Sequence, residues 1–422
     1  MRFQTLPQWL KWQESLHFTE VDPGLERVGL VWQKLGGISK LPFTVITVAG
    51  TNGKGSSVAM LESILRAAGY QTGTYTSPHL LQYNERICMN GQACDDKTIC
   101  EAFDRIDIAR DDISLTYFEF ATLAAADIFS RNNIDIAILE VGMGGRLDAV
   151  NLFDTDIALI TPISLDHMAW LGTNREAIGF EKAGIIRQDK PVVCSENMPP
   201  QSLINHATSL QSATFCADSE FSIIINKDQW RWSNSHVELL NLPFPALKGA
   251  YQFQNAAAVL QVISLLNQQD FDISEDAIRC GLASVKLSGR FQQIHGDITT
   301  ILDVTHNQQG AENLAKLLVE IPCSGQTFAV LSMLKDKDVS TVASILKPVI
   351  DIWYVAGLEG SRGMTSDTLA ERLSDIIDQN RIRPFTTVIE AYEQAVIAAK
   401  KGDRVLVFGS FHTVEAVLNS TL

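Results

Sequence analysis

Apolar residues in this chain gather in short runs that alternate with stretches of helical periodicity. The first clear run, residues 45–49, is rich in β-branched side chains and predicts a buried strand. A polar, glycine-rich stretch follows at residues 50–57, and an apolar stripe at helical spacing then begins with Val58 and Leu61. Gly69 stands where the end of a helix favours a left-handed residue. The pattern therefore predicts a strand, a loop and a helix in that order.

The same alternation continues along the chain and predicts an α/β fold in which helices cover parallel sheets. Strands of the first series are predicted at residues 71–76, 134–141, 157–161 and 190–194. A second series predicts strands at 298–303, 328–331, 352–355 and 404–410, with helices at 311–318 and 391–400. The two series predict a domain at residues 1–284, a linker at 285–296 and a smaller domain at 297–422.

The composition narrows the class of protein. The chain of 422 residues has a formal net charge of −15 and an isoelectric point near 5.0, so nucleic acids and acidic membranes would repel it. Neither an export signal nor an uninterrupted apolar stretch of about 18 residues is evident. The seven cysteines are scattered without a C-x-x-C pair, which predicts free thiols in a reducing compartment. We therefore expect a cytoplasmic protein without nucleic-acid or membrane partners.

The loop at residues 50–57 has the chemistry of a phosphate-binding site. Its glycines leave backbone N–H groups pointing inward, and the following helix adds the positive end of its dipole. Lys54 is expected to bridge the outer phosphates of a nucleotide, and Ser56 or Ser57 to reach a phosphate-bound Mg²⁺. The spacing differs from the common G-x-x-x-x-G-K-[ST] pattern, which disfavours a generic kinase or GTPase. The alternative is a strand-turn-helix corner in which the glycines only satisfy turn geometry.

Three side chains at the ends of predicted strands carry further chemistry. Ser77, Glu140 and His167 each stand at or shortly after the end of such a strand. Ligands of open α/β sheets collect beyond the carboxyl ends of the strands, so these groups are expected to converge on one Mg²⁺ beside the phosphates. Taken singly, each has a plain alternative as a turn residue, a solvated carboxylate or a loop histidine.

The loop and the strand ends belong to a longer series of motifs. In chain order these are Gly50-Thr51-Asn52-Gly53-Lys54-Gly55-Ser56, Ser77-Pro78-His79-Leu80, Leu115-Thr116-Tyr117-Phe118-Glu119, Glu140-Val141-Gly142-Met143-Gly144-Gly145-Arg146-Leu147-Asp148, Leu165-Asp166-His167, Glu181-Lys182-Ala183-Gly184-Ile185, Ser288-Gly289-Arg290-Phe291, Asp303-Val304-Thr305-His306-Asn307 and Gly409-Ser410-Phe411-His412. The series closely resembles the folylpolyglutamate synthase/dihydrofolate synthase family, from about residue 25 to residue 413. So many motifs in the same order make a chance resemblance negligible.

The resemblance implies an ATP-dependent ligase of the Mur-ligase superfamily, of the bifunctional bacterial type. Its fold would be α/β: a P-loop-containing, Mur-ligase-like ATPase domain with a parallel-rich sheet, plus a smaller Rossmann-like C-terminal domain. By the family pattern, Ser77, Glu140 and His167 hold Mg²⁺, and a carbamylated Lys182 supports a second Mg²⁺. The sequence alone favours a different interpretation of Lys182, a surface ion pair with Glu181 or another neighbour.

The family pattern also assigns the nucleotide contacts. They fall on Gly50, Thr51, Asn52, Gly53, Lys54, Gly55 and Ser56, and on Asn255, Arg290 and Asp303. Lys54, Lys182 and His306 are the implied catalytic residues. The resemblance leaves open whether K⁺ binds as a further cation. Thr305 and Ser288 depart from the alanine and proline that are common in the family, without removing a proposed ligand.

The implied reaction joins L-glutamate to dihydropteroate and to reduced folates after ATP has phosphorylated the acceptor carboxylate. The implied substrate contacts are Asp22, Gly24, Leu25, Thr116, Phe118, Arg146 and Asp148. Phe118 is expected to stack on the pterin and Asp148 to hydrogen-bond its edge, whereas core packing is nearly as good an interpretation of Tyr117. We expect a monomer.

Two other functions fit part of the sequence. A Mur ligase of cell-wall synthesis shares the ATPase chemistry but adds an N-terminal domain of about a hundred residues, whereas only about 44 residues precede the first predicted strand. A nucleotide-gated binding or scaffold protein would keep the phosphate loop, but has no use for the magnesium ligands, Lys182 and the Asp303–His306 pair together. Glutamate-dependent phosphate release separates a ligase from a scaffold.

Overall fold

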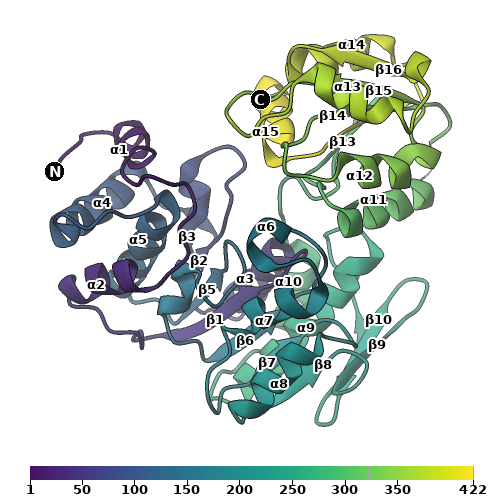
Figure 1. The fold of residues 1–422 in the computed structure, drawn as a ribbon. Helices are drawn as coiled ribbons and strands as arrows, with labels where there is room; N and C mark the ends of the chain where they lie inside the picture. The colour runs from purple at the N-terminus through teal and green to yellow at the C-terminus, as the bar shows by residue number, and fades with distance from the viewer. Residues whose placement is uncertain (322, 422) are drawn as a thin grey trace. The chain divides into compact units, whose positions relative to one another are not determined.

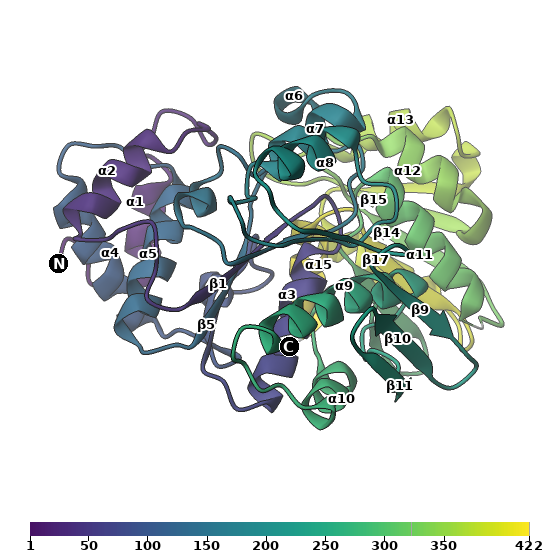
Figure 2. The ribbon, with the colours of Figure 1, turned by 90° about the horizontal axis from the view of Figure 1, so that it is seen from below.

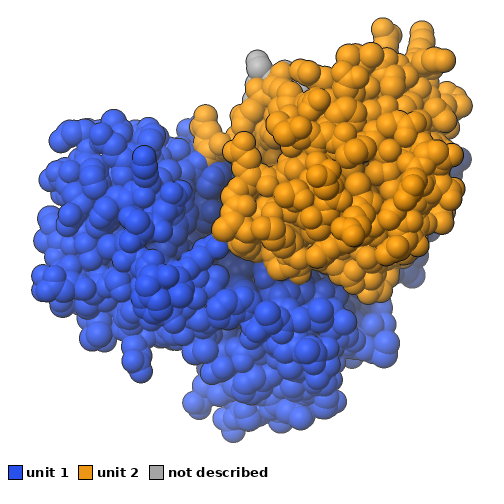
Figure 3. Space-filling view, turned by 45° about the horizontal axis from the view of Figure 1, so that its top comes forward, with its two compact units in different colours: residues 1–79, 83–246, 252–285 blue, residues 80–82, 247–251, 286–422 orange. Residues whose placement is uncertain are grey.

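The computed structural model describes residues 1–321 and 323–421, which form two compact units (Figures 1 and 3). Unit 1 comprises residues 1–79, 83–246 and 252–285, and unit 2 comprises residues 80–82, 247–251 and 286–422. Residues 322 and 422 of the predicted domain 297–422 lie outside the described residues. The predicted boundaries stay a prediction, and the sequence pattern gave no sign that two short segments before residue 285 group with unit 2.

Unit 1 is built on an eight-stranded sheet. Its strands are β1 (Thr44–Ala49), β2 (Thr72–Tyr75), β3 (Ile87–Met89), β4 (Gln92–Ala93), β5 (Ile136–Glu140), β6 (Ile157–Ile160), β7 (Val192–Cys194) and β8 (Thr214–Cys216). The order across the sheet is β4-β3-β2-β5-β1-β6-β7-β8, and all neighbours pair in parallel except at the β3 and β4 edge. The β-branched run at residues 45–49 thus becomes the buried centre of the sheet, as parallel strands covered on both faces require.

Helices pack against this sheet in groups. They are α1 (Leu6–Gln13), α2 (Glu26–Lys34), α3 (Lys54–Ala67), α4 (Asp96–Arg110), α5 (Tyr117–Arg131), α6 (Met168–Leu171), α7 (Arg175–Ala183), α8 (Gln201–Ser209), α9 (Ala250–Asn267) and α10 (Glu275–Ser284). Short 3₁₀ turns lie at Tyr83–Arg86 and Ala149–Leu152. Helices α1, α2, α4 and α5 contact one another, and α3 contacts α10 (Figure 2).

The apolar pattern predicts a helix at residues 120–129, but helix α5 begins three residues earlier, at Tyr117. Thr116 and Glu119 form a capping box that starts the helix early. The Thr116 hydroxyl accepts from the Glu119 N–H at 3.2 Å, and Glu119 Oε2 accepts from the Thr116 N–H at 2.7 Å. The T-x-x-E spacing was a signal available in the sequence.

A small antiparallel sheet in unit 1 was not predicted. It consists of β9 (Phe221–Ile225), β10 (Trp230–Asn234) and β11 (Glu238–Leu242), with β10 in the middle. Trp230 and Trp232 are buried on one face and Arg231 is exposed on the other. This alternation is the ordinary mark of a half-buried strand.

Unit 2 contains a six-stranded sheet. Its strands are β12 (Gln292–Ile294), β13 (Thr299–Asp303), β14 (Thr327–Leu331), β15 (Ile352–Ala356), β16 (Ile382–Phe385) and β17 (Arg404–Phe408), in the order β12-β13-β17-β14-β15-β16. Its helices are α11 (Gln308–Glu320), α12 (Val339–Leu346), α13 (Ser366–Ser374), α14 (Val388–Ala398) and α15 (Phe411–Thr421), with 3₁₀ turns at Lys347–Val349 and Gln379–Arg381. Only β12 pairs antiparallel, and it lies within the predicted linker.

The predicted α/β architecture is confirmed in both units. Apolar clusters fill the space between the sheets and their helices, and two clusters in unit 2 contain alternate residues of β13, β14 and β17. Within residues 1–321 and 323–421, no helix combines the length and apolarity that a bilayer crossing requires.

Candidate functional site

The carboxyl ends of four adjacent strands carry the phosphate loop and the three residues predicted to hold Mg²⁺. In the order β2-β5-β1-β6, they lead to Ser77, Glu140, the phosphate loop and His167. The Ser77 N–H donates to Glu140 Oε2 at 3.2 Å, so two predicted magnesium ligands meet across neighbouring strands. Parallel pairing places all four loops at one edge of the sheet, which is where such folds bind ligands. His167 is the N-cap residue of α6 and has a left-handed conformation (φ 51°), and its N–H donates to Asp166 Oδ1 at 2.8 Å.

The phosphate loop turns sharply from β1 into α3, which begins at Lys54. Gly53 has φ 95°, and a Cβ there would lie 2.6 Å from Asn255 Oδ1 on α9. Glycine is therefore needed both for the turn and for the close approach of α9. Asn255 donates to Gln252 Oε1 at 3.0 Å, and Gln252 donates to Ser56 Oγ at 3.3 Å. The fold thus brings Asn255 to the loop from about 200 residues away in sequence.

Two lysines meet at the start of this loop. Lys182, on α7, is 3% exposed, and its Nζ donates to the Gly50 carbonyl at 2.7 Å. Lys54 Nζ donates to the same carbonyl at 3.3 Å. Burial, followed by repulsion from Lys54, lowers the pKa of Lys182 to about 7. In a large fraction of the molecules, the side chain of Lys182 is therefore an uncharged amine near neutral pH. The uncharged amine is the form that reacts with CO₂.

The interpretation of Lys182 as a surface ion-pair partner of Glu181 is wrong, because Lys182 is buried. Glu181 pairs with Arg146 instead, at 2.9 Å. The Arg146 guanidinium also lies 5.6 Å from the centre of the Phe180 ring, which holds this predicted substrate contact against α7.

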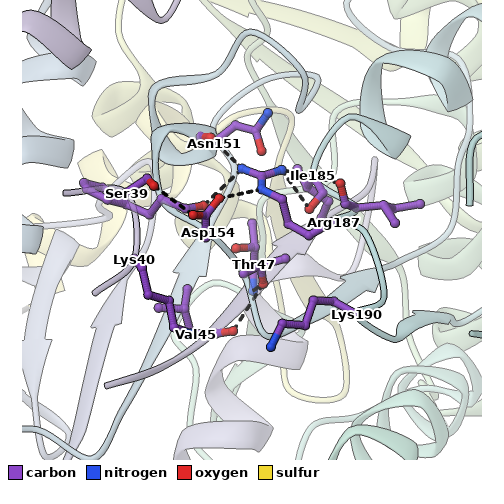
Figure 4. A network of polar contacts seen from close by, with 12 residues as sticks. Ser39, Lys40, Val45, Thr47, Asn151, Asp154, Ile185, Arg187 and Lys190 are labelled. Carbon is purple, nitrogen blue, oxygen red and sulfur yellow. Dashed lines mark hydrogen bonds and ion pairs between the residues drawn. The ribbon is translucent and has the colours of Figure 1, made fainter. Parts of the chain in front are cut away.

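A polar network around Arg187 joins the segment after α7 to Asn151 and Asp154 (Figure 4). Arg187 donates to Asp154 Oδ1 at 3.0 Å and to the Asn151 carbonyl at 2.8 Å. Asn151 Nδ2 in turn donates to the Gly184 carbonyl at 3.0 Å. A guanidinium that binds carbonyls at the end of a helix satisfies groups that would otherwise lack partners. Sequence reasoning missed this network, since its members lie in segments that have no local motif in common.

An aromatic ring and a buried carboxylate lie together around Gly142, just after β5. A Cβ at Gly142 would lie 2.7 Å from the Phe118 ring and 3.3 Å from Asp148 Oδ2, so a larger residue would push them apart. Asp148 accepts from the N–H groups of Met143 at 2.9 Å and Val150 at 3.0 Å. Burial nevertheless raises the pKa of Asp148 to about 6. An apolar surface beside an acceptor suits a flat, hydrogen-bonding ligand.

The other predicted substrate contacts border this pair. The Gly24 N–H donates to the Leu147 carbonyl at 3.2 Å, which places the segment before α2 beside Asp148. Leu25 is the N-cap residue of α2, and the Thr116 hydroxyl is engaged in the cap of α5. Tyr117 packs edge-on against Tyr83, with ring centres 5.6 Å apart, as expected for core packing.

In unit 2, the predicted residues gather at the carboxyl end of β13. Asp303 accepts from the Phe291 N–H at 2.8 Å and from the Thr305 N–H at 2.9 Å, and thereby fixes the residue that follows Arg290. The Arg290 guanidinium lies 5.2 Å from the centre of the Phe411 ring. His306 Nδ1 donates to the Val304 carbonyl at 2.9 Å, which fixes the orientation of the ring.

Both units match families of known domains. Residues 48–263 match the Mur ligase middle domain, and residues 289–411 match the Mur ligase glutamate ligase domain. The fold and the phosphate loop thus define a Mur-type ligase.

Full-length relatives narrow this class further. The dihydrofolate synthase/folylpolyglutamate synthase of Escherichia coli is 44% identical over 98% of this chain and 94% of its own length, and that of Haemophilus influenzae is 42% identical over 97% and 96%. The chain belongs to the dihydrofolate synthase/folylpolyglutamate synthase family. The predicted family, fold class and enzyme class are confirmed.

Solved structures agree with this assignment. A structure of E. coli FolC in complex with DHPP and ADP has 43% identity and a TM-score of 0.93, and the match covers 99% of this chain and 98% of that one. A bifunctional folylpolyglutamate synthase/dihydrofolate synthase with Mn, AMPPNP and L-glutamate bound has 41% identity and a TM-score of 0.91, with coverage of 99% and 98%.

Proposed function

We propose that this enzyme uses ATP and Mg²⁺ to join L-glutamate to dihydropteroate and to reduced folates, as a monomer in the cytoplasm. One observation carries the proposal: a single edge of the unit 1 sheet holds both the phosphate loop with Lys182 and the Phe118–Asp148 pair. A phosphorylating centre and a site for a flat ligand are both needed when a carboxylate must be activated before coupling. The relatives with bound DHPP, ADP, AMPPNP and L-glutamate support the same assignment.

In the proposed reaction, the acceptor carboxylate takes the γ-phosphoryl group of ATP and becomes an acyl phosphate. The uncharged amine of glutamate then attacks the acyl carbon, the amide bond forms, and inorganic phosphate leaves. Lys54 and the N–H groups at the start of α3 would stabilise the negative charge that spreads over the transferring group. Arg290, Asp303 and His306 are proposed to act on the nucleotide from unit 2.

The residues at the strand ends fit a divalent cation. Ser77 and Glu140 are already adjacent, and Glu140 is only 6% exposed, so its carboxylate suits a hard cation. His167 supplies a nitrogen ligand, and a carbamate on Lys182 would add anionic oxygens. When bound, Mg²⁺ would neutralise charge on the phosphates.

The proposed function is tested by steady-state phosphate release. We expect release with ATP and dihydropteroate only when L-glutamate is added, and the same dependence with tetrahydrofolate. Phosphate release that does not depend on glutamate with either acceptor would reject the assignment as a ligase and favour a nucleotide-gated binding protein. Release with only one acceptor would reject the bifunctional assignment.

Glu140→Gln and His167→Ala are expected to raise the Mg²⁺ concentration for half-maximal activity at least about tenfold, since even outer partners of metal ligands contribute that much. The KM for dihydropteroate should change little, because neither residue is assigned to the pterin. A magnesium titration of activity measures both effects, with His206→Ala on α8 as the control. An unchanged magnesium midpoint in both variants would make the cluster structural.

Asp148→Asn is expected to raise the KM for dihydropteroate about tenfold, because an amide cannot accept hydrogen bonds as strongly as a carboxylate. The raised pKa of Asp148, about 6, gives a second prediction with a definite sign. The wild-type KM should rise as the pH falls through 6, since protonation removes the carboxylate, and the KM of the asparagine variant should stay level. A KM that responds equally to pH in both proteins would contradict the assignment.

A further inference from the structure

We propose that Arg27 is a positioning residue beside the proposed pterin site, which is formed by Phe118 and Asp148. Arg27 would hold together the two segments that border this site, residues 22–25 and the first turn of α5. Arg27 was not among the predicted site residues. The inference rests on the proposed function, and it adds a residue that orders this site without forming its surface.

The Arg27 guanidinium binds both segments at once. Its Nη1 donates to Asp22 Oδ2 at 2.5 Å, and its Nη2 donates to the Asp22 carbonyl at 2.8 Å and to Glu119 Oε1 at 3.0 Å. The Arg27 side chain is 28% exposed and that of Glu119 only 5%, so the pair is largely shielded from solvent. Ion pairs of this kind hold geometry better than exposed pairs, because water competes less with them.

The Glu119 carboxylate transmits this contact to the start of α5. One of its oxygens accepts from Arg27, and the other accepts from the Thr116 N–H at 2.7 Å to cap the helix. Phe118 lies in that first turn, and its ring rests over Gly142 beside Asp148. The direction of the Phe118 ring therefore depends on the carboxylate that Arg27 holds.

The segment at residues 22–25 is held from three sides. Asp22 Oδ2 also contacts His17 Nε2 at 3.1 Å, and His17 Nδ1 contacts Ser114 Oγ at 3.0 Å. The Gly24 N–H donates to the Leu147 carbonyl, next to Asp148. Arg27 thus joins the segment to α5, while Gly24 joins it to the loop that carries Asp148.

Arginine is the residue that this geometry requires. Two carboxylates, Asp22 and Glu119, converge on one cation, and without it they would repel each other across the site. A planar guanidinium can bind three oxygens in fixed directions, whereas a lysine ammonium on a flexible stem cannot reproduce them. A site that is ordered before binding avoids the entropic cost of ordering its loops when the ligand binds.

The test is the separation of KM values in Arg27→Gln and Arg27→Lys. We expect the KM for dihydropteroate to rise about tenfold or more in both, since small displacements of a binding group are costly. The KM for ATP should stay within about twofold, because the phosphate loop is not part of the clamp. Arg105→Gln is a matched control. Arg105, on α4, is 31% exposed, and its Nε donates to Asp127 Oδ2 at 2.9 Å. Asp127 lies on α5, the helix that also carries Glu119, but away from its first turn.

Glu119→Gln provides a second route to the same answer. A glutamine keeps the capping box but removes the charge that faces Arg27, so the helix start is preserved. We expect Glu119→Gln to raise the dihydropteroate KM, and the double variant with Arg27→Gln to show less than the product of the two effects. If Arg27→Gln does not fold, Glu119→Gln alone decides the proposal.

The outcomes separate this inference from the proposed function. If Phe118→Ala and Asp148→Asn raise the dihydropteroate KM but folded Arg27→Gln does not, or if Arg27→Gln raises all KM values equally, the positioning role is overturned. If Phe118→Ala and Asp148→Asn also leave this KM unchanged, the proposed pterin site is wrong, and the clamp has nothing to position.

Discussion

Lys182→Arg is expected to lose ligase activity by at least about a hundredfold, the scale of removing one electrostatic contact to a transition state. Lys182 is buried with its amine against the Gly50 carbonyl, and its lowered pKa leaves it able to react with CO₂. An arginine at this position keeps its positive charge and cannot form a carbamate. Phosphate release with dihydropteroate and glutamate measures the loss, and a thermal melt shows whether the fold survives.

Lys182→Ala should be equally inactive, but a short carboxylic acid such as acetate should restore part of its activity by filling the vacated ligand position. Lys190→Arg is the control, because Lys190 pairs with Asp156 at the opposite end of the sheet and is 44% exposed. In ¹³C-bicarbonate, the wild-type enzyme should show a carbamate resonance that Lys182→Arg lacks. An active Lys182→Arg enzyme, or a resonance that persists in it, would reject the carbamate.

Lys54→Ala is expected to abolish ATP turnover while the protein stays folded. Lys54 opens α3, and its amine donates to the backbone carbonyls of Gly50 and Thr51, so its removal leaves the apolar core intact. Its charge, by contrast, is proposed to meet the outer phosphates of the nucleotide. The measurement is phosphate release beside a thermal melt, with exposed Lys97→Ala as the control.

The same variant bears on Lys182. The charge of Lys54 lowers the pKa of Lys182, so Lys54→Ala should raise that pKa and reduce the fraction of uncharged amine at neutral pH. In Lys54→Ala, the carbamate resonance should then reach half of its maximum at a higher bicarbonate concentration than in the wild-type enzyme. Normal turnover in folded Lys54→Ala would reject the phosphate-loop assignment.

Features written in contiguous residues could be predicted from the sequence. The run at 45–49 and the glycines after it predict β1 and the loop, because strand burial and turn geometry are local. Helix α3 begins at Lys54, one turn before the apolar stripe that starts with Val58, and Gly69 is left-handed as predicted. Ser77 and Glu140 could be placed together because parallel strands share one carboxyl edge.

Contacts that depend on how distant segments fold together could not be predicted. Nothing local marks Arg27 as the partner of Glu119, 92 residues away, or Arg187 as the partner of Asn151, 36 residues away. The burial of Lys182 was also hidden, since its neighbours Glu181 and Gly184 suggest an exposed turn. By contrast, β10 and the start of α5 have local signals, which are the alternation at residues 230–232 and the T-x-x-E spacing at residues 116–119.

The membership of unit 2 bears on how this ligase can be divided. Leu80 is 6% exposed and belongs to the same apolar cluster as Val304 and Val414, and Tyr251 packs against the cluster on the other face of that sheet. A protein severed after residue 285 would release a C-terminal piece without either side chain, and one buried leucine is worth about 2 kcal/mol. The segment after residue 285 is thus expected to be less stable by itself than unit 2 as a whole. Chimaeras between relatives should exchange residues 286–422 together with residues 80–82 and 247–251. Otherwise the apolar residues of one relative would pack against the sheet of another.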